Sequence, residues 1–184
     1  MVKIGIDPSI NSTGICVDLG DKQYIYYNIV SHATKKLKQF KHDNVYIIDY
    51  GKQVEKYDDY PSKEHQKTNN IFSICTAIKE IISKYNPDVI LMEGVSYGST
   101  GSAALVDLAG LNFAIRMSIR NLNRSVPLII IPPTSVKKFA VANGQADKCV
   151  IVDAWKRIDK NIADITDIKI DDLADSFFIS QYKE

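Results

Sequence analysis

The sequence has few cysteines and no long apolar run, and each absence argues against a class of protein. Cys16, Cys75 and Cys149 are widely spaced and form no CxxC pair, which argues against a zinc site, and their apolar neighbours predict buried thiols. No run reaches the roughly 18 apolar residues of a transmembrane helix. The first ten residues lack a signal peptide's apolar stretch, so we expect a cytoplasmic protein with no membrane partner.

A strong excess of one charge is also missing, because 23 basic residues face 22 acidic residues for a net charge of +1. This balance does not by itself indicate a nucleic-acid partner. The basic residues are nevertheless clustered, in the run KKLKQFKH at residues 35–42 and in the shorter segments SVKKF and DAWKRI. Seen alone, such clusters are typical of solvated surface.

The pattern of apolar residues predicts one α/β domain over residues 1–184, whose 45% hydrophobic content suffices for a sizeable core. Antiparallel strands come first and αβ units follow. Alternating or continuous apolar segments predict strands over residues 2–7, 22–31 (pairing with 13–19), 44–50, 88–93 and 126–133. The polar segment 51–66 predicts a loop, and helical spacing predicts helices from residue 71 to the KYNP segment and over 101–122, 134–142, 147–158 and 171–184.

Acidic residues stand at the ends of three apolar elements. Asp7 ends the first strand, Glu93 ends the strand DVILME, and Asp172 and Asp175 share one face of the last helix. Each has an ordinary structural explanation: Asp7 as a turn residue, Glu93 as a surface acid, and Asp171 or Asp172 as a helix N-cap. Their combination in this order is more informative, since adjacent parallel strands place Asp7 beside Glu93.

Four converging carboxylates without basic partners would repel one another. A hard divalent cation removes that repulsion, and oxygen ligands suit Mg²⁺ or Mn²⁺. Two such ions, about 3.5–4 Å apart, can stabilise both the attacking and the leaving oxygen of a phosphodiester displacement. The four acids therefore predict a metal-dependent site for phosphodiester chemistry.

In the segments that carry these acids, the sequence resembles the RuvC family of Holliday-junction resolvases, within the RNase H-like superfamily. GIDPSINSTGICV is similar to the family's first-strand signature, and VILMEGV to its second acidic motif. VKKFAVANGQADK and DDLADSFFIS resemble the third motif and the final Asp-x-x-Asp helix. The four motifs run in order from residue 2 to residue 181, whereas residues 20–87 match only in pattern.

The resemblance implies an α/β fold of the RNase H-like type: a mixed five-stranded sheet, three antiparallel then two parallel strands, with helices on both faces. It also implies that Asp7, Glu93, Asp172 and Asp175 are catalytic and hold two Mg²⁺ or Mn²⁺ ions. Lys137 and Lys148 stand at lysine positions that contact DNA in the family, though each could be a solvated surface lysine. The family is homodimeric, because a four-way junction requires two symmetric cuts.

Two departures from the family stand out. Family members commonly carry an aromatic wedge three residues after the glutamate, but that position is Ser96 here, and Tyr97 follows. Tyr97 could stack on an unpaired base or be an ordinary surface tyrosine. The segment between the second and third strands is longer and more basic than in the family. Such departures fit a phage or otherwise divergent member.

The sequence therefore predicts a metal-dependent endonuclease that cleaves four-way or other branched DNA by paired nicks, leaving 5′-phosphate and 3′-hydroxyl ends. A role in recombination, repair or the processing of replication intermediates follows from that substrate. Two alternatives stay open: an RNase H-like nuclease acting on RNA–DNA hybrids or flaps, and a non-catalytic junction-binding protein. Four intact acids argue against the second of these, because binding alone would not require them.

Overall fold

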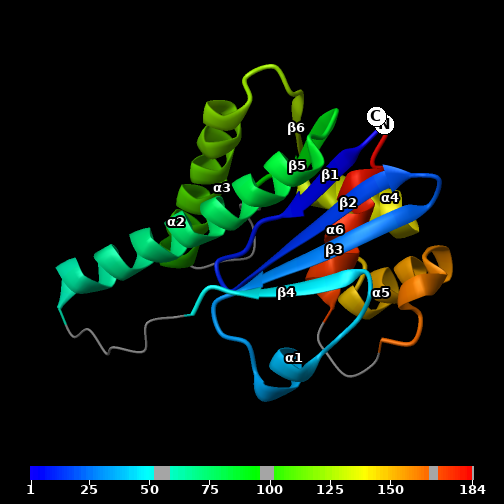
Figure 1. The fold of residues 1–184 in the computed structure, drawn as a ribbon, viewed down its shortest axis with the longest axis horizontal. Coiled ribbons are helices and arrows are strands. Elements are labelled where there is room, and N and C mark those ends of the chain that lie inside the picture. Colours follow the sequence, from blue (N-terminus) through cyan, green and yellow to red (C-terminus); the bar gives the residue numbers. More distant parts are fainter. Residues whose placement is uncertain (52–58, 96–101, 166–169, 184) are drawn as a thin grey trace.

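The computed structural model describes residues 1–51, 59–95, 102–165 and 170–183. Within them, six strands form one sheet in the order β4-β3-β2-β1-β5-β6 (Figure 1). The strands are β1 (Lys3–Asp7), β2 (Ser12–Gly20), β3 (Gln23–Val30), β4 (Val45–Asp49), β5 (Val89–Glu93) and β6 (Leu128–Ile131). The helices are α1 (Lys35–Gln39), α2 (Tyr60–Tyr85), α3 (Ser102–Leu122), α4 (Pro133–Val141), α5 (Lys148–Ile158) and α6 (Asp171–Gln181), with a 3₁₀ turn at Lys160–Ile162.

The centre of the sheet has the predicted topology. β1, β2 and β3 are antiparallel neighbours, and β5 and β6 continue the sheet parallel to β1. The family resemblance implies five strands, whereas the sheet has six, because the strand predicted over residues 44–50 is present as β4 and joins the edge of the sheet parallel to β3. Parallel neighbours need a crossover, and residues 31–44, which include α1, carry the chain back along the sheet before β4 begins.

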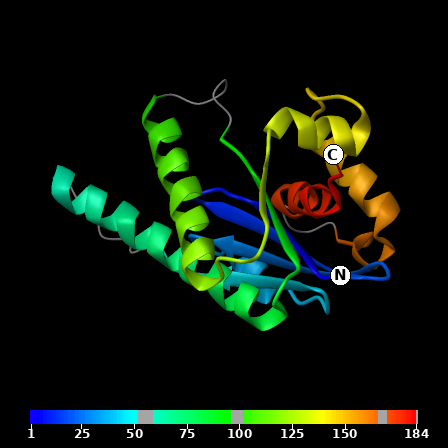
Figure 2. The same ribbon diagram turned by 90° about the horizontal axis from the view of Figure 1, so that it is seen from above.

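Helices cover both faces of the sheet, as predicted. α2 and α3 pack on one face, where Ile4, Ile6 and Ile90 of the sheet meet Ile78 and Ile115 of the helices. α4, α5 and α6 cover the other face, with α6 lying directly against the central strands (Figure 2). Strand residues therefore alternate between two apolar cores, which explains why the strands are apolar along most of their length.

Several boundaries differ from the sequence prediction. Residues 60–66 are not a loop but the first turns of α2, because the Asp59 side chain accepts a hydrogen bond from the Ser62 backbone N–H (2.9 Å) and Pro61 occupies the first turn. β6 is an edge strand rather than a buried one, and its Ile129 and Ile130 are each 36% exposed. Both differences arise from contacts that hydrophobic periodicity does not encode.

The cysteines and the helices test two further predictions. Cys16 and Cys75 are buried as predicted, but Cys149 is exposed, because α5 directs its apolar stripe, with Ile151 and Trp155, inward and turns Cys149 outward. Among the residues described, no helix combines the length and the apolarity needed to cross a membrane.

Candidate active site

Asp7 and Glu93 lie at the same end of two adjacent parallel strands. The register of β1 and β5 pairs Ile6 with Met92, so the next residue on each strand is a carboxylate. Ile6 and Met92 are fully buried in the core beneath α2 and α3, and alternation therefore turns Asp7 and Glu93 to the opposite face, which α6 covers. Asp7 is only 8% exposed.

Two glycines allow α6 to reach these carboxylates. Gly14 pairs with Asp7 across β1 and β2, and a Cβ atom added to Gly14 would lie 2.0 Å from the backbone oxygen of Asp172. A Cβ atom on Gly5 would lie 2.2 Å from the backbone oxygen of Ser176. Since neither strand has a side chain at these points, the helix backbone lies directly on the sheet. Asp172 and Asp175 on the first turns of α6 therefore come to the end of β1.

The four acids influence one another electrostatically. Burial raises the pKa of Asp7 well above its usual value, and the charges of Glu93, Asp175 and Asp172 raise it further. Burial and the Asp175 charge raise the pKa of Glu93 to about 7. Burial also raises the pKa of Asp175 to about 6, against the attraction of Lys148. The structure thus brings together all four predicted acids, at the cost of mutual repulsion.

Lys148 faces the same cluster from the start of α5. Its Nζ atom lies 2.6 Å from Oδ2 of Asp171 and 3.5 Å from Oδ1 of Asp172. Burial lowers the pKa of Lys148, but the hydrogen bond to Asp171 and the charges of Asp172 and Asp175 outweigh that effect, so its pKa is raised. Lys148 is therefore a counter-charge of the acidic cluster, and its side chain remains 55% exposed.

Lys137 lies near the cluster as well. Its Nζ atom donates a hydrogen bond to the carbonyl of Ala146 (3.2 Å), and its charge lowers the pKa of both Glu93 and Asp175. The turn that carries Ala146 leads into α5 and Lys148, so both predicted lysines border the acids. Ser96 and Tyr97, the other predicted DNA-contacting residues, lie outside the described residues.

Sequence reasoning missed two residues that support the site. It considered Asp171 only as a helix cap, whereas its carboxylate is 7% exposed and pairs with Lys148. It did not consider Asn112 of α3, whose Nδ2 donates a hydrogen bond to the backbone carbonyl of Glu93 (2.9 Å). Asn112 is 1% exposed and fixes the end of β5 from the opposite side of the sheet. The only sequence signal for Asn112 was a single polar residue within the otherwise apolar stretch at residues 108–115.

The acidic cluster is not a finished coordination shell. Over residues 1–51, 59–95, 102–165 and 170–183, no three His, Cys, Asp or Glu side chains are already arranged to hold a metal ion. The chemistry of the cluster nevertheless fits a hard divalent cation, because its acids offer only oxygen donors, and the pKa values of Asp7, Glu93 and Asp175 are raised by burial and by neighbouring acids.

A mixed sheet of this order, with acids at the ends of its two central parallel strands and on the helix that crosses them, is the RNase H-like fold. Solved structures support this class. Thermus thermophilus RuvC in complex with a Holliday junction substrate aligns with a TM-score of 0.60 at 19% identity, covering 98% of this chain and 90% of that chain. The yeast mitochondrial Holliday junction resolvase aligns with a TM-score of 0.56 at 19% identity, covering 97% and 75%.

The sequence itself places the chain within one family of that class. The family described as "Crossover junction endodeoxyribonuclease RuvC" matches residues 3–180, so the chain belongs to the RuvC family. A relative of that description from Caldicellulosiruptor saccharolyticus is 26% identical over 178 residues, covering 96% of this chain and 88% of the relative. One from Alkaliphilus oremlandii is 25% identical over 181 residues, covering 98% and 90%. The chain is thus a divergent member of a family of metal-dependent nucleases.

Proposed function

We propose that this protein is a crossover junction endodeoxyribonuclease that resolves four-way DNA junctions by paired, symmetric nicks. Membership of the RuvC family supports the activity and the substrate class. The observation that carries the proposal is the convergence of Asp7, Glu93, Asp172 and Asp175 at one end of the sheet, where the charges of the other three acids raise the pKa of Asp7. The reaction would serve DNA recombination and repair in the cytoplasm of a bacterial or phage-infected cell.

Asp7, Glu93, Asp172 and Asp175 are the residues that would hold the metal, with Mg²⁺ or Mn²⁺ as the ions that suit their oxygen donors. Two bound ions would supply an activated water for in-line attack and charge stabilisation for the leaving 3′ oxygen. The side chains would have to close around the ions, because they do not form a finished shell on their own. Asp7 anchors the cluster, since its strand is hydrogen-bonded on both sides.

The lysines at the rim bind and orient the phosphodiester backbone in this proposal. In the absence of DNA, Lys148 is held by Asp171 and Asp172. Neutralisation of the acids by metal would weaken its attraction to Asp172 and leave it available for a phosphate beside the scissile bond. Lys137, on the same side of the acidic cluster, donates one hydrogen bond to a backbone carbonyl and is therefore less constrained than Lys148. Ser96, at the family's wedge position, and Tyr97, the aromatic residue directly after it, are proposed to contact the opened centre of the junction.

We expect Lys148→Ala to weaken junction binding and to reduce the salt dependence of binding. Each lost phosphate contact lowers the slope of log K against log salt by about 0.9 on duplex arms. Gel shifts over a range of salt concentrations measure both quantities, with Lys160→Ala as an exposed control outside the cluster. Unchanged affinity and slope would show that Lys148 only compensates the charge of Asp171 and Asp172.

Two symmetric nicks require two active sites, and α3 offers a surface on which two copies can meet. Val106, Phe113 and Met117 are 69%, 60% and 61% exposed and lie along one stripe of this helix. Phe72 on the adjacent α2 is 68% exposed. An apolar stripe that meets solvent in this way commonly marks an interface between proteins. We propose a homodimer with α3 near its two-fold axis.

We expect Phe113→Asp to convert the dimer into a monomer, because dimerisation would bury the new carboxylate against an apolar partner surface. Light scattering at micromolar concentration measures the mass, and Tyr60→Asp serves as a control, since Tyr60 is 74% exposed but lies at the far end of α2. The monomer should bind junctions more weakly and lose the paired pattern of cuts. A wild-type protein that is monomeric both with and without junction would disprove the paired-cut proposal.

The decisive test of the function is incubation of the protein with an immobile four-way junction, labelled in turn on each strand, in the presence of Mg²⁺. Nicks at symmetric positions on two opposing strands are the expected result. RNA–DNA hybrid and flap substrates in parallel reactions test the alternative nuclease activities. Binding of the junction without any nick, with either Mg²⁺ or Mn²⁺, would favour a non-catalytic junction-binding protein instead.

A further inference from the structure

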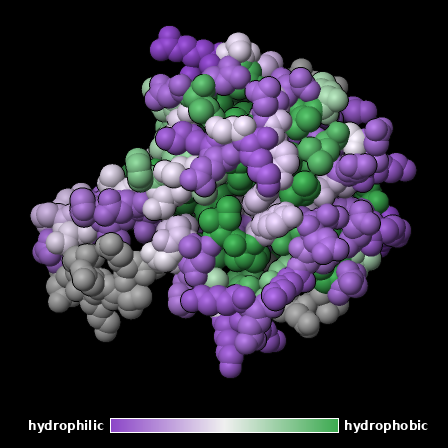
Figure 3. Space-filling view, in the orientation of Figure 1, coloured by the Kyte–Doolittle hydropathy of each residue, from purple (hydrophilic) through white to green (hydrophobic). Residues whose placement is uncertain are grey.

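The basic run at residues 35–42 is not part of the acidic cluster, yet the fold gives it a defined place. Lys35, Lys36 and Lys38 belong to the short helix α1, whose first turn is capped by the Thr34 hydroxyl oxygen, which accepts a hydrogen bond from the Leu37 backbone N–H (3.3 Å). Leu37 turns toward the protein, whereas the lysines on either side of it are exposed. The surface over α1, at the bottom of the view in Figure 3, is hydrophilic.

The positive charge of this segment is only partly compensated. Residues 31–42 contain no acidic residue. Lys38 forms an ion pair with Asp49 of β4, with 3.8 Å between Nζ and Oδ2. Within the part of the chain that the structure describes, Lys35, Lys36 and Lys41 form no ion pair with a carboxylate. Three exposed cations on one short segment are therefore available to an anionic partner.

The register of the sheet places the start of this segment and Lys38 at the same end as the acidic cluster, whereas the segment's end leads to the start of β4, where His42 pairs with Val45. Asp7 pairs with Gly14, Gly14 with Asn28, and Asn28 with Ile47, so that β4 lies three strand spacings from β1, about 14 Å. Asp49 lies two residues beyond Ile47, toward the end of the sheet where the acids are. The backbone N–H of Ala33 donates a hydrogen bond to Asp49 (3.2 Å), which ties the start of the basic segment to that end.

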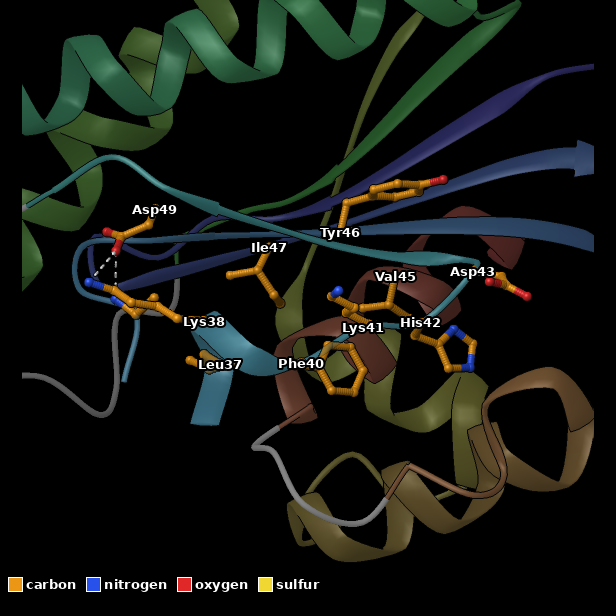
Figure 4. A pocket seen from close by; sticks show the side chains of 11 residues that line it. Leu37, Lys38, Phe40, Lys41, His42, Asp43, Val45, Tyr46, Ile47 and Asp49 are labelled. Atoms are coloured by element: carbon orange, nitrogen blue, oxygen red, sulfur yellow. Dashed lines mark hydrogen bonds and ion pairs between the residues drawn. The ribbon is translucent and has the colours of Figure 1, made fainter. Parts of the chain in front are cut away.

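The segment also lies on the same face of the sheet as the acids. Phe40, Val45 and Ile47 belong to the apolar core under α6, the helix that carries Asp172 and Asp175. Between the segment and β4 there is a hollow of about 490 Å³, which Lys38 and Lys41 help to line (Figure 4). The ring of Phe40 stacks against His42 in an interplanar angle of 1°, which helps to hold this part of the loop against the sheet. The exposed lysines therefore extend from a segment whose apolar residues are packed against the sheet.

We infer that Lys35, Lys36 and Lys41 bind the phosphate backbone of a duplex arm of the junction, beside the arm's scissile strand. The inference rests on the proposed nuclease function and adds a second contact surface to it. The spacing of about 14 Å between β1 and β4 is on the scale of the DNA major groove, which is about 12 Å wide. When one strand presents its phosphate to the acidic cluster, the backbone across the groove would lie toward the β4 edge of the sheet, which carries α1. Such contacts fix the position of the arm without reading its sequence.

The experiment compares the wild-type protein with the triple variant Lys35→Gln, Lys36→Gln, Lys41→Gln. The control is the triple variant Lys22→Gln, Arg124→Gln, Lys183→Gln, which removes the same charge from the opposite end of the sheet, in the β2–β3 turn, the α3–β6 loop and the end of α6. Binding to a labelled four-way junction is measured without divalent metal over a range of salt concentrations, and hydroxyl-radical footprints map the protected nucleotides. Melting curves check that both variants fold.

We expect the α1 variant to bind at least about tenfold more weakly, with a salt slope reduced by about 2–3 for three lost contacts. Footprint protection should disappear from one side of the arms, while cleavage at saturating protein with Mg²⁺ continues, because the acids are unchanged. The control variant should keep a slope near that of wild type. If the α1 variant bound the junction with the affinity and salt slope of wild type, or if both variants lost affinity equally, the inference would be overturned while the nuclease function stayed intact. A wild-type protein that neither binds nor cuts the junction would overturn both.

Discussion

Asp7→Asn is expected to abolish junction cleavage and, at the same time, to make the metal-free protein more stable. The loss should be at least about 10³-fold in single-turnover rate, or about 4 kcal/mol of transition-state stabilisation, because the residue at the centre of the acidic cluster can no longer supply a charged ligand. Glu93→Gln should behave alike. Junction binding should persist in both variants, since it depends on lysines rather than on these acids.

The gain in stability follows from the direction of the pKa shifts. Burial and the neighbouring acids raise the pKa of Asp7 well above its ordinary value, so the folded protein holds this proton more tightly than the unfolded chain does. A group of this kind favours folding below its unfolded pKa of about 4 and loses that contribution as the pH rises through its folded pKa. The stability gained by Asp7→Asn should therefore appear near neutral pH and vanish below about pH 4.

Thermal melting in EDTA measures this effect, with a rise of about 2–4 °C for each kcal/mol of repulsion removed. Asp21→Asn provides the matched control, because it makes the same chemical change at an exposed turn at the opposite end of the sheet. Mg²⁺ should raise the melting temperature of the wild type more than that of Asp7→Asn. Near-normal cleavage by Asp7→Asn would remove Asp7 from the site, and an unchanged melting temperature at pH 7 would show that the acids do not repel one another.

Gly5→Ala is expected to destabilise the protein strongly and to remove most of its activity. The new Cβ atom would lie 2.2 Å from the backbone oxygen of Ser176, 2.5 Å from the Ser180 nitrogen and 2.9 Å from the Ser180 Cα. All three are backbone atoms of α6, so no side chain can rotate away and the whole helix must shift. Overpacking a core typically costs about 1–3 kcal/mol, and we expect about 3 kcal/mol or more here.

Melting curves and nicking assays on the same preparations test this second prediction. A loss of about 3 kcal/mol corresponds to roughly 10 °C in a protein of this size. Gly110→Ala is the matched control for the melting curves alone, since Gly110 lies on the proposed dimer stripe of α3 and an added Cβ atom would meet nothing within 4 Å. That variant should melt slightly higher, because alanine favours a helix by about 0.5–1 kcal/mol over glycine. If Gly5→Ala melted and nicked like wild type, α6 would not be seated on the strand as the structure has it.

The four carboxylates of the candidate site could be predicted from the sequence because the patterns that reveal them are local. Asp7 and Glu93 interrupt apolar strands at their last residue, and the spacing of Asp172 and Asp175 places them on one helical face. The period of apolar residues and the spacing of acids are properties of short segments, so they can be recognised without knowing which other segments pack against them. The same holds for the order of antiparallel strands and αβ units, from which the topology of the sheet centre could be predicted.

The sequence could not reveal how these elements meet. Gly5 and Gly14 are ordinary strand glycines until α6 is placed on them, and Asp171 is a plain helix cap until Lys148 reaches it from α5. The place of β4 depends on the crossover between residues 31 and 44, which periodicity does not describe. Sequence patterns alone identified the four acids and the two lysines as candidate site residues. Tertiary packing alone decided how close these side chains lie and which of their pKa values are shifted. It also set the start of the basic segment at the same end of the sheet, because contacts between distant segments depend on the shape of both surfaces.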